Sequence, residues 1–141
     1  MAEVFSRSWA EEWCLTLNSS ESYRGAATAW EGSVALVMTR DASARSPQRA
    51  IFLDLWHGEC RGARVATDQD LDEATYVLSG LASSWRDVLT GRLAPLMAVM
   101  GGKIRLTRGS IASLVPYAAA ARELVTTATE MENVFPEGWG D

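Results

Sequence analysis

The sequence has little of what catalytic and metal sites most often use. Its 141 residues include one histidine, His57, and two cysteines, Cys14 and Cys60, which have no CxxC spacing and no histidine cluster beside them. This scarcity argues against a zinc site and against a disulfide framework, and it favours a reducing compartment. The GxSxG, GxxxxGKS/T and GxGxxG motifs, which supply a nucleophile or a phosphate cradle, are also missing. We therefore expect no cofactor and no metal.

Positive charge and long apolar runs are scarce as well. The chain has 13 Lys and Arg against 18 Asp and Glu, for a net charge of −5. A general nucleic-acid binder needs a basic surface that displaces counterions from phosphates, so this class is disfavoured. No run approaches the roughly 18 apolar residues of a membrane-spanning helix. The N-terminus also lacks the basic start and apolar core of a signal peptide. We expect a soluble, cytoplasmic protein.

Two local patterns that could mark a site fit better as turns. The acidic run TDQDLDEA over 67–74 resembles the start of an EF-hand. That motif needs Gly at its sixth position and Glu at its twelfth, where this chain has Glu73 and Ser79. We interpret the run as a solvated acidic connection. His57 stands beside Gly58 in a predicted hairpin turn, so we interpret it as a turn residue and not as a catalytic base.

Aromatic side chains, by contrast, are plentiful. The chain has six tryptophans, each a large apolar group that needs packing partners. Trp9, Trp13 and Leu17 recur every four residues, which predicts a helix over about 8–18 with one aromatic stripe. Ser8 and Glu11 have the form of a capping box at its start. A second helix is predicted after Ser20, with Tyr23, Ala27 and Trp30 on one face.

From residue 33 the apolar period changes to two, which indicates strands. Residues 33–67 are predicted to form an antiparallel meander, with the polar loop 40–49 inside it and a turn at His57. A fourth strand is predicted over 74–80 and a fifth over 104–107. The residues expected on the bulky face of the first two strands are Val34, Leu36, Met38, Ile51, Leu53 and Leu55.

Three more helices are predicted in the second half. The first is capped by Ser83 or Ser84 and ends at Gly91. The second spans 93–100, and the third begins near Leu114 because Pro116 suits a first turn. The expected apolar face of the third helix comprises Leu114, Ala118, Ala121, Val125 and Ala128. Helices and strands are largely segregated along the chain, which favours an α+β fold with helices against one face of a sheet.

The run from Leu93 to Met100 has no polar side chain. A helix that is apolar all round is expected to be buried all round. Its two sides could contact the sheet and the last helix, or the sheet and an apolar ligand. Residue types alone leave these two alternatives open.

From Ala74 to about Leu114 the chain resembles the sterol carrier protein type 2 family. The residues that carry the resemblance are the helix from Trp85 to Gly91-Arg92, then Pro95, Ala98, Val99 and Met100, then Gly102-Lys103, Ile104-Arg105-Leu106 and Gly109. Upstream, the strand ending in Trp56-His57-Gly58 matches the family's hairpin. The chain has one residue more than the family pattern between Lys103 and Gly109, and Val99-Met100 where the family often has paired aromatics.

The resemblance implies an α+β fold with a five-stranded, mainly antiparallel sheet, helices packed on one face and an enclosed apolar cavity. It implies non-catalytic binding and transfer of a sterol-like lipid, a fatty acid or an acyl chain. The expected organisation is an N-terminal helical segment, 1–30, packed on a lipid-binding domain, 31–129, followed by a C-terminal tail, 130–141. Transient membrane contact and a homodimer are compatible with this interpretation.

Candidate site residues follow from the resemblance and the apolar pattern. The residues expected to line the cavity are Trp85, Val88, Leu89, Leu93, Leu96, Met97, Met100, Leu114 and Tyr117. Lys103 and Arg105 are the candidates for contact with an anionic head group.

Two alternative functions stay open at this point. The first is a dimerisation or regulatory module with the same fold and a filled core, whose contact surface would be Trp9, Trp13, Phe135 and Trp139. The second is a hydrolase or transferase that acts on an acyl substrate through His57.

Overall fold

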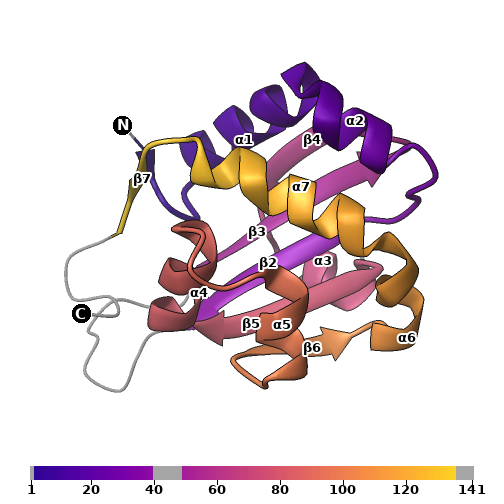
Figure 1. The fold of residues 1–141 in the computed structure, drawn as a ribbon. Coiled ribbons are helices and arrows are strands. Elements are labelled where there is room, and N and C mark those ends of the chain that lie inside the picture. Colours follow the sequence, from indigo (N-terminus) through magenta and orange to yellow (C-terminus); the bar gives the residue numbers. More distant parts are fainter. Residues whose placement is uncertain (1, 40–48, 136–141) are drawn as a thin grey trace.

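A five-stranded mixed sheet forms the centre of the computed structural model, which describes residues 2–39 and 49–135 (Figure 1). Most of the predicted polar loop, residues 40–48, and Trp139 lie outside the described residues. The strands are β2 (Val34–Thr39), β3 (Arg49–Trp56), β4 (Glu59–Val65), β5 (Tyr76–Leu81) and β6 (Ile104–Arg108). Their spatial order is β4-β3-β2-β5-β6.

Three of the four strand pairs are antiparallel, and β2 pairs with β5 in parallel. The mainly antiparallel sheet predicted from the sequence is therefore confirmed. A tight turn joins β3 to β4, where His57 and Gly58 both have positive φ angles of 51° and 84°. These values match a type I′ hairpin turn, whose twist suits antiparallel strands.

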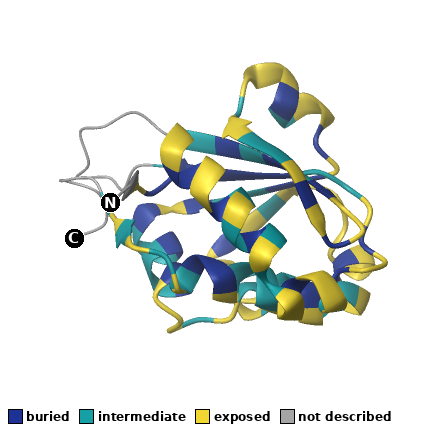
Figure 2. Cartoon of the chain, turned by 90° about the horizontal axis from the view of Figure 1, so that it is seen from above, coloured by how far each residue is buried: buried dark blue, intermediate teal, exposed yellow. Residues whose placement is uncertain are grey.

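Most helices cover one face of the sheet (Figure 1). They are α1 (Arg7–Ser19), α2 (Glu21–Ala26), α4 (Ala82–Leu89), α5 (Pro95–Met100), α6 (Ile111–Leu114), the 3₁₀ helix η1 (Val115–Tyr117) and α7 (Ala118–Thr129). Figure 2 shows buried positions along the strands and exposed ones on the outer turns of the helices. None of these helices, within the part of the chain that the structure describes, is long and apolar enough to cross a membrane.

Side chains that alternate along β2 lie on the two faces of the sheet, as predicted. Val34, Leu36 and Met38 face the helix layer and belong to the main core. Ala35 and Val37, which alternate with them, belong to a smaller cluster on the opposite face of the sheet. The main core therefore lies between the sheet and the helix layer.

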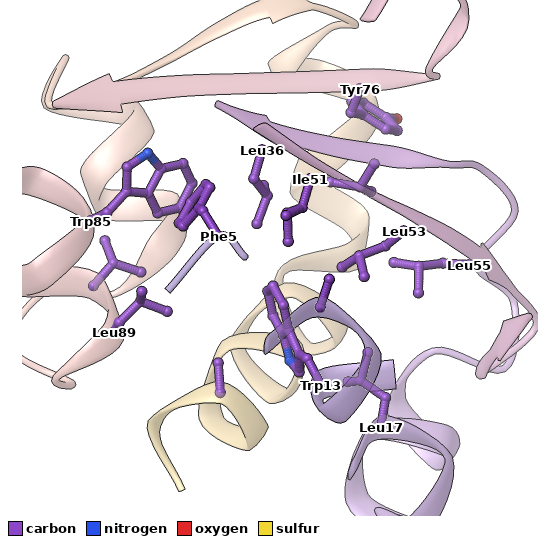
Figure 3. Packing of buried hydrophobic residues seen from close by; sticks show 14 of the residues in the cluster. Phe5, Trp13, Leu17, Leu36, Ile51, Leu53, Leu55, Tyr76, Trp85 and Leu89 are labelled. Carbon is purple, nitrogen blue, oxygen red and sulfur yellow. The ribbon is translucent and has the colours of Figure 1, made fainter. Parts of the chain in front are cut away.

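The N-cap of helix α1 lies two residues earlier than predicted, and the helix runs from Arg7 to Ser19. Its N-cap is Ser6, whose side chain accepts a hydrogen bond from the Trp9 backbone, and not Ser8. Trp9, Trp13 and Leu17 are almost fully buried, and Figure 3 shows Trp13 and Leu17 facing the β3 side chains. The proposed contact surface of Trp9 and Trp13 for a partner is therefore wrong, because both rings are buried in the core of this chain.

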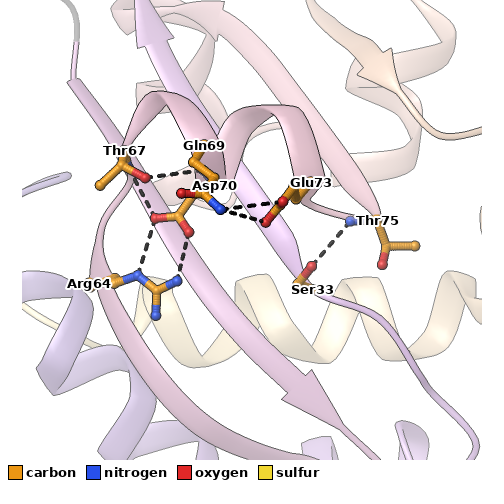
Figure 4. A network of polar contacts seen from close by, with 7 residues as sticks. All are labelled: Ser33, Arg64, Thr67, Gln69, Asp70, Glu73 and Thr75. Carbon is orange, nitrogen blue, oxygen red and sulfur yellow. Dashed lines mark hydrogen bonds and ion pairs between the residues drawn. The ribbon is translucent and has the colours of Figure 1, made fainter.

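The acidic run is a short helix, α3 (Asp68–Glu73), and not an open connection (Figure 4). Thr67 and Asp70 form a reciprocal capping box. The Asp70 carboxylate also accepts hydrogen bonds of 2.6 and 3.1 Å from the Arg64 guanidinium. Sequence reasoning weighed the run as a calcium loop and as a solvated acidic connection, and it overlooked that Thr67-x-x-Asp70 is itself a helix start. The helix covers the face of the sheet opposite the other helices.

Asp70 should make stability depend on pH at the acid end. The Arg64 side chain and, less strongly, the Thr67 backbone N–H lower the pKa of Asp70 from 3.8 to about 2. Because the pKa is lower in the folded state, this contribution is complete above about pH 4 and is lost as the pH falls toward about 2. Asp70→Asn should remove that dependence and reduce the free energy of unfolding at neutral pH by about 1 kcal/mol. Urea unfolding from about pH 2 to neutral pH measures both effects.

Asp72→Asn, on the same helix, is the matched control for the loss of one negative charge. If Asp70→Asn kept the full acid dependence of the wild type, the assignment of this stability to the Asp70–Arg64 pair would be contradicted.

The C-terminal third departs from prediction in two places. Instead of one helix from Leu114, the chain forms α6 and the 3₁₀ turn η1, with Pro116 inside it, before α7 begins at Ala118. Part of the tail, 130–141, for which no strand was predicted, forms β7 (Asn133–Val134), which pairs in parallel with β1 (Ala2–Glu3). A two-stranded sheet thus brings the described ends of the chain together.

The extra residue before Gly109 is absorbed as an irregularity of β6. Leu78 pairs with Leu106 and Val77 pairs with Arg108, so Thr107 has no partner residue across the ladder. Because Arg108 pairs with Val77, which faces away from the main core, the alternation of faces along β6 changes after Thr107, as a β-bulge allows.

One prediction from composition is wrong. Cys14 of α1 and Cys60 of β4 form a disulfide, with their Cα atoms 5.4 Å apart. Cysteine count and spacing did not reveal this pair because it depends on how α1 packs across β4. The argument from cysteine usage for a reducing compartment no longer holds, and a cytoplasmic location stays a prediction.

Candidate functional site

A nearly wholly apolar pocket of about 80 Å³ lies between the sheet and the helix layer. Figure 3 shows Leu36, Leu55 and Trp13, from the sheet and α1, directed into the space between these layers. The lining residues are Trp13, Tyr23, Trp30, Val34, Leu36, Leu55, Tyr76, Leu78, Trp85, Leu89, Pro95, Leu96, Val99, Leu114, Ala120, Ala121, Leu124 and Val125.

Burial differs around the pocket. The lining side chains from α1, α2 and α4 are buried, as are those from β2 and β3. On α5 and α7, by contrast, Leu96, Val99, Ala121, Leu124 and Val125 are only partly buried. The pocket is therefore most accessible between α5 and α7, which pack against each other over its outer side.

The polar atoms of the lining side chains are almost all engaged within the protein. The Trp85 indole N–H donates to the Val37 carbonyl at 2.9 Å, and the Trp30 indole donates to the Gly32 carbonyl at 2.8 Å. No lining residue is charged. The pocket can therefore hold an apolar molecule, and it offers no counter-charge to a buried ion.

Comparison with solved structures gives two close relatives. A crystal structure of sterol carrier protein 2 is 46% identical, has a TM-score of 0.83, and is matched over 92% of this chain and all (100%) of that one. A Thermus thermophilus protein described as a candidate sterol carrier protein is also 46% identical, with a TM-score of 0.84 over 96% and 94% of the two chains. The chain belongs to the sterol carrier protein 2 family.

A more distant member of the sterol carrier protein 2 group shows the same fold. The apo form of sterol carrier protein 2 from Yarrowia lipolytica is 12% identical, with a TM-score of 0.59 over 91% of each chain. No protein-family model and no curated protein matches the sequence.

Four of the nine residues predicted to line a cavity do line this pocket: Trp85, Leu89, Leu96 and Leu114. Val88 is buried in the core beside them. Leu93 and Tyr117 pack against the core without lining the pocket, and the Tyr117 ring lies edge-on to Trp30 at 5.1 Å between centroids.

Met97 and Met100 lie on the outer side of α5, where their exposed fractions are 60% and 64%. The expectation that an all-apolar helix is buried all round is therefore wrong for α5. Only Ala98 of this helix is fully buried, while Leu96 and Val99 face the pocket.

The candidate head-group residues lie away from the pocket. Lys103 and Arg105 are both exposed and absent from its lining, although Ile104 between them is buried. Arg105 points away from the core because side chains alternate along β6.

His57 is not at the pocket either. Its Nε2 lies 2.6 Å from the Glu31 carboxylate, and both side chains are about half exposed. Among residues 2–39 and 49–135, no group of three or more His, Cys, Asp or Glu side chains could hold a metal ion.

Sequence reasoning missed the aromatic wall from the N-terminal segment, formed by Trp13, Tyr23 and Trp30. Their spacing was recognised, but it was assigned to packing and to a partner surface. The available signal was the number of aromatic residues in the first 30 positions, which include Trp9, Trp13, Tyr23 and Trp30.

Proposed function

We propose that the chain binds an apolar ligand, such as a sterol-like lipid, a fatty acid or an acyl chain, in this pocket and carries it without chemistry of its own. The observation that carries the proposal is the pocket lining, which is apolar and uncharged in a family whose solved members are named as sterol carriers. The exposed position of His57, away from the pocket, gives no support to acyl chemistry.

Removal of ligand surface from water supplies the affinity. Burial of roughly 300 Å² of apolar surface, at about 25 cal/mol per Å², contributes about 7 kcal/mol before the costs of ordering. Ligand pockets usually measure about 300–1,000 Å³, whereas this one measures about 80 Å³. Binding of a whole lipid therefore requires the pocket to widen.

Helix α5 is the element most suited to move. It has six residues, and Gly91 precedes it and Gly102 follows it, both with positive φ. Its outer side presents Met97 and Met100 to solvent. We include transient contact of this side with a membrane in the proposal, since exposed methionines adapt to irregular apolar surfaces.

The proposed organisation keeps residues 31–129 as the ligand-binding domain and 1–30 as a segment packed on it. Trp13, Tyr23 and Trp30 give this segment a direct part in the pocket. The C-terminal tail is residues 130–141.

The small free volume also favours a second candidate, a dimerisation or regulatory module in which the core is filled by its own side chains. Phe135, partly buried and 4.8 Å from the Arg86 guanidinium, would belong to its contact surface. The two candidates differ in whether the purified protein contains or takes up a lipid.

Native mass spectrometry of the purified protein, followed by solvent extraction, separates the two candidates. We expect a co-purifying apolar molecule at close to one per chain. A ligand-free mass together with no binding of fluorescent sterols or fatty acids would overturn the carrier proposal, and a dimer mass would then favour the second candidate.

A further inference from the structure

Five side chains that line the pocket end in a polar group, and four of these groups form hydrogen bonds within the protein. Besides Trp85 and Trp30, the Trp13 indole donates to the Thr127 hydroxyl at 3.0 Å and to the Leu124 carbonyl at 3.2 Å. The Tyr76 hydroxyl lies 2.6 Å from the Ser113 hydroxyl. The fifth polar tip is the hydroxyl of Tyr23.

The Tyr23 side chain is only 2% exposed and lines the pocket. Within residues 2–39 and 49–135 its hydroxyl makes no hydrogen bond, although its backbone N–H donates to the Ser20 side chain that caps α2. A buried tyrosine hydroxyl normally finds a partner, because leaving it unpaired costs free energy. Tyr23 therefore offers one unused hydrogen-bonding group in an otherwise apolar site.

The chemistry of this group restricts what it can bind. Burial raises the pKa of Tyr23 to about 12, so the hydroxyl is protonated and neutral near pH 7. It can donate one hydrogen bond and accept others. No lining residue carries a charge that could neutralise a carboxylate or a phosphate, and burial of an unpaired ion is strongly unfavourable.

We propose that the Tyr23 hydroxyl binds the single polar group of the ligand, and that the ligand class is an apolar molecule with one neutral hydrogen-bonding group, such as a sterol or a fatty alcohol. This assignment rests on the proposed carrier function. The polar end of the ligand would lie at α2, and its apolar body would extend toward α4 and α5. In Figure 1, α2 and α5 lie on opposite sides of α7.

The test compares decanol with chlorodecane, two chains of equal length of which only decanol forms strong hydrogen bonds. Both are delivered from methyl-β-cyclodextrin and detected through the tryptophans of the pocket. In Tyr23→Phe we expect about tenfold weaker binding of decanol, which equals about 1.4 kcal/mol. Binding of chlorodecane should stay within about twofold of the wild type, because the substitution removes only the hydroxyl. The melting temperature should not fall, since no hydrogen bond within the protein is lost.

Tyr76→Phe is the matched control. It also removes a hydroxyl from a pocket tyrosine, but one that Ser113 already engages. This variant should melt at a lower temperature and keep the wild-type ratio of decanol to chlorodecane affinity.

Each other outcome is decisive. Unchanged decanol binding in Tyr23→Phe, or equal losses for both probes, would overturn the role of the hydroxyl. Wild-type protein that binds decanoate at pH 8 as tightly as decanol would overturn the neutral ligand class. If the wild type bound neither decanol nor chlorodecane, the carrier function itself would fail, and the Tyr23 assignment with it.

Discussion

Replacement of Ala121 by phenylalanine should lower affinity for a fluorescent sterol by about 100-fold or more. Ala121 lines the pocket from α7 and is only partly buried, so the larger side chain enters a free volume of about 80 Å³. A ligand that loses room for four methylene groups loses about 3 kcal/mol at roughly 0.8 kcal/mol each, which corresponds to about 100-fold in the dissociation constant. Fluorescence titration measures this loss.

Ala119→Phe provides the matched control on the same helix. Ala119 is exposed and does not line the pocket, so this variant should bind like the wild type. Thermal unfolding of both variants separates blocked binding from misfolding, and added apolar contacts in the pocket should leave Ala121→Phe at least as stable as the wild type. Full binding by Ala121→Phe would place the ligand elsewhere on the molecule.

Features that depend on local sequence were predictable. Alternation around Leu36 identified the two faces of β2, and Ser20 marked the start of α2, where its side chain accepts a hydrogen bond from the Tyr23 N–H. The helix predicted over 93–100 agrees with α5 (Pro95–Met100) to within two residues, with Pro95 in its first turn and Gly101 at its C-cap. Each of these signals acts through the backbone of a few neighbouring residues, so it needs no knowledge of distant contacts.

Features that depend on tertiary packing were not predictable in the same way. Met97 and Met100 are apolar like core residues but lie on the outer side of α5, because the elements that pack against this helix, α4, α7 and β6, cover only its other side. Trp13 and Tyr23 reach the pocket because α1 and α2 pack beside α7. No spacing in the sequence encodes which helices become neighbours. The apolar spacing therefore identified the residues of an apolar face, but it did not identify what packs against that face.

Removal of the disulfide should have the largest effect on stability. Cys14 and Cys60 are 46 residues apart in sequence. In the chain-entropy model, a cross-link that closes a loop of this length reduces the entropy of the unfolded chain enough to stabilise the protein by about 4 kcal/mol. Cys14→Ala/Cys60→Ala should therefore lower the free energy of unfolding by about that amount, as measured by urea unfolding. Denatured wild-type protein should also show no reactive thiol before reduction.

A second connection between α1 and β4 keeps this test specific. The Asn18 side chain accepts a hydrogen bond from the Cys60 N–H at 2.8 Å and donates to the Cys60 carbonyl at 2.9 Å. The double variant keeps both hydrogen bonds and should retain the native fold. Its loss of stability is therefore expected to come from the higher entropy of the unfolded chain without the cross-link. If reduced wild type and the double variant were as stable as the oxidised protein, α1 would be held by Asn18 and the buried tryptophans alone. The position of Trp13 in the pocket would then be independent of the redox state.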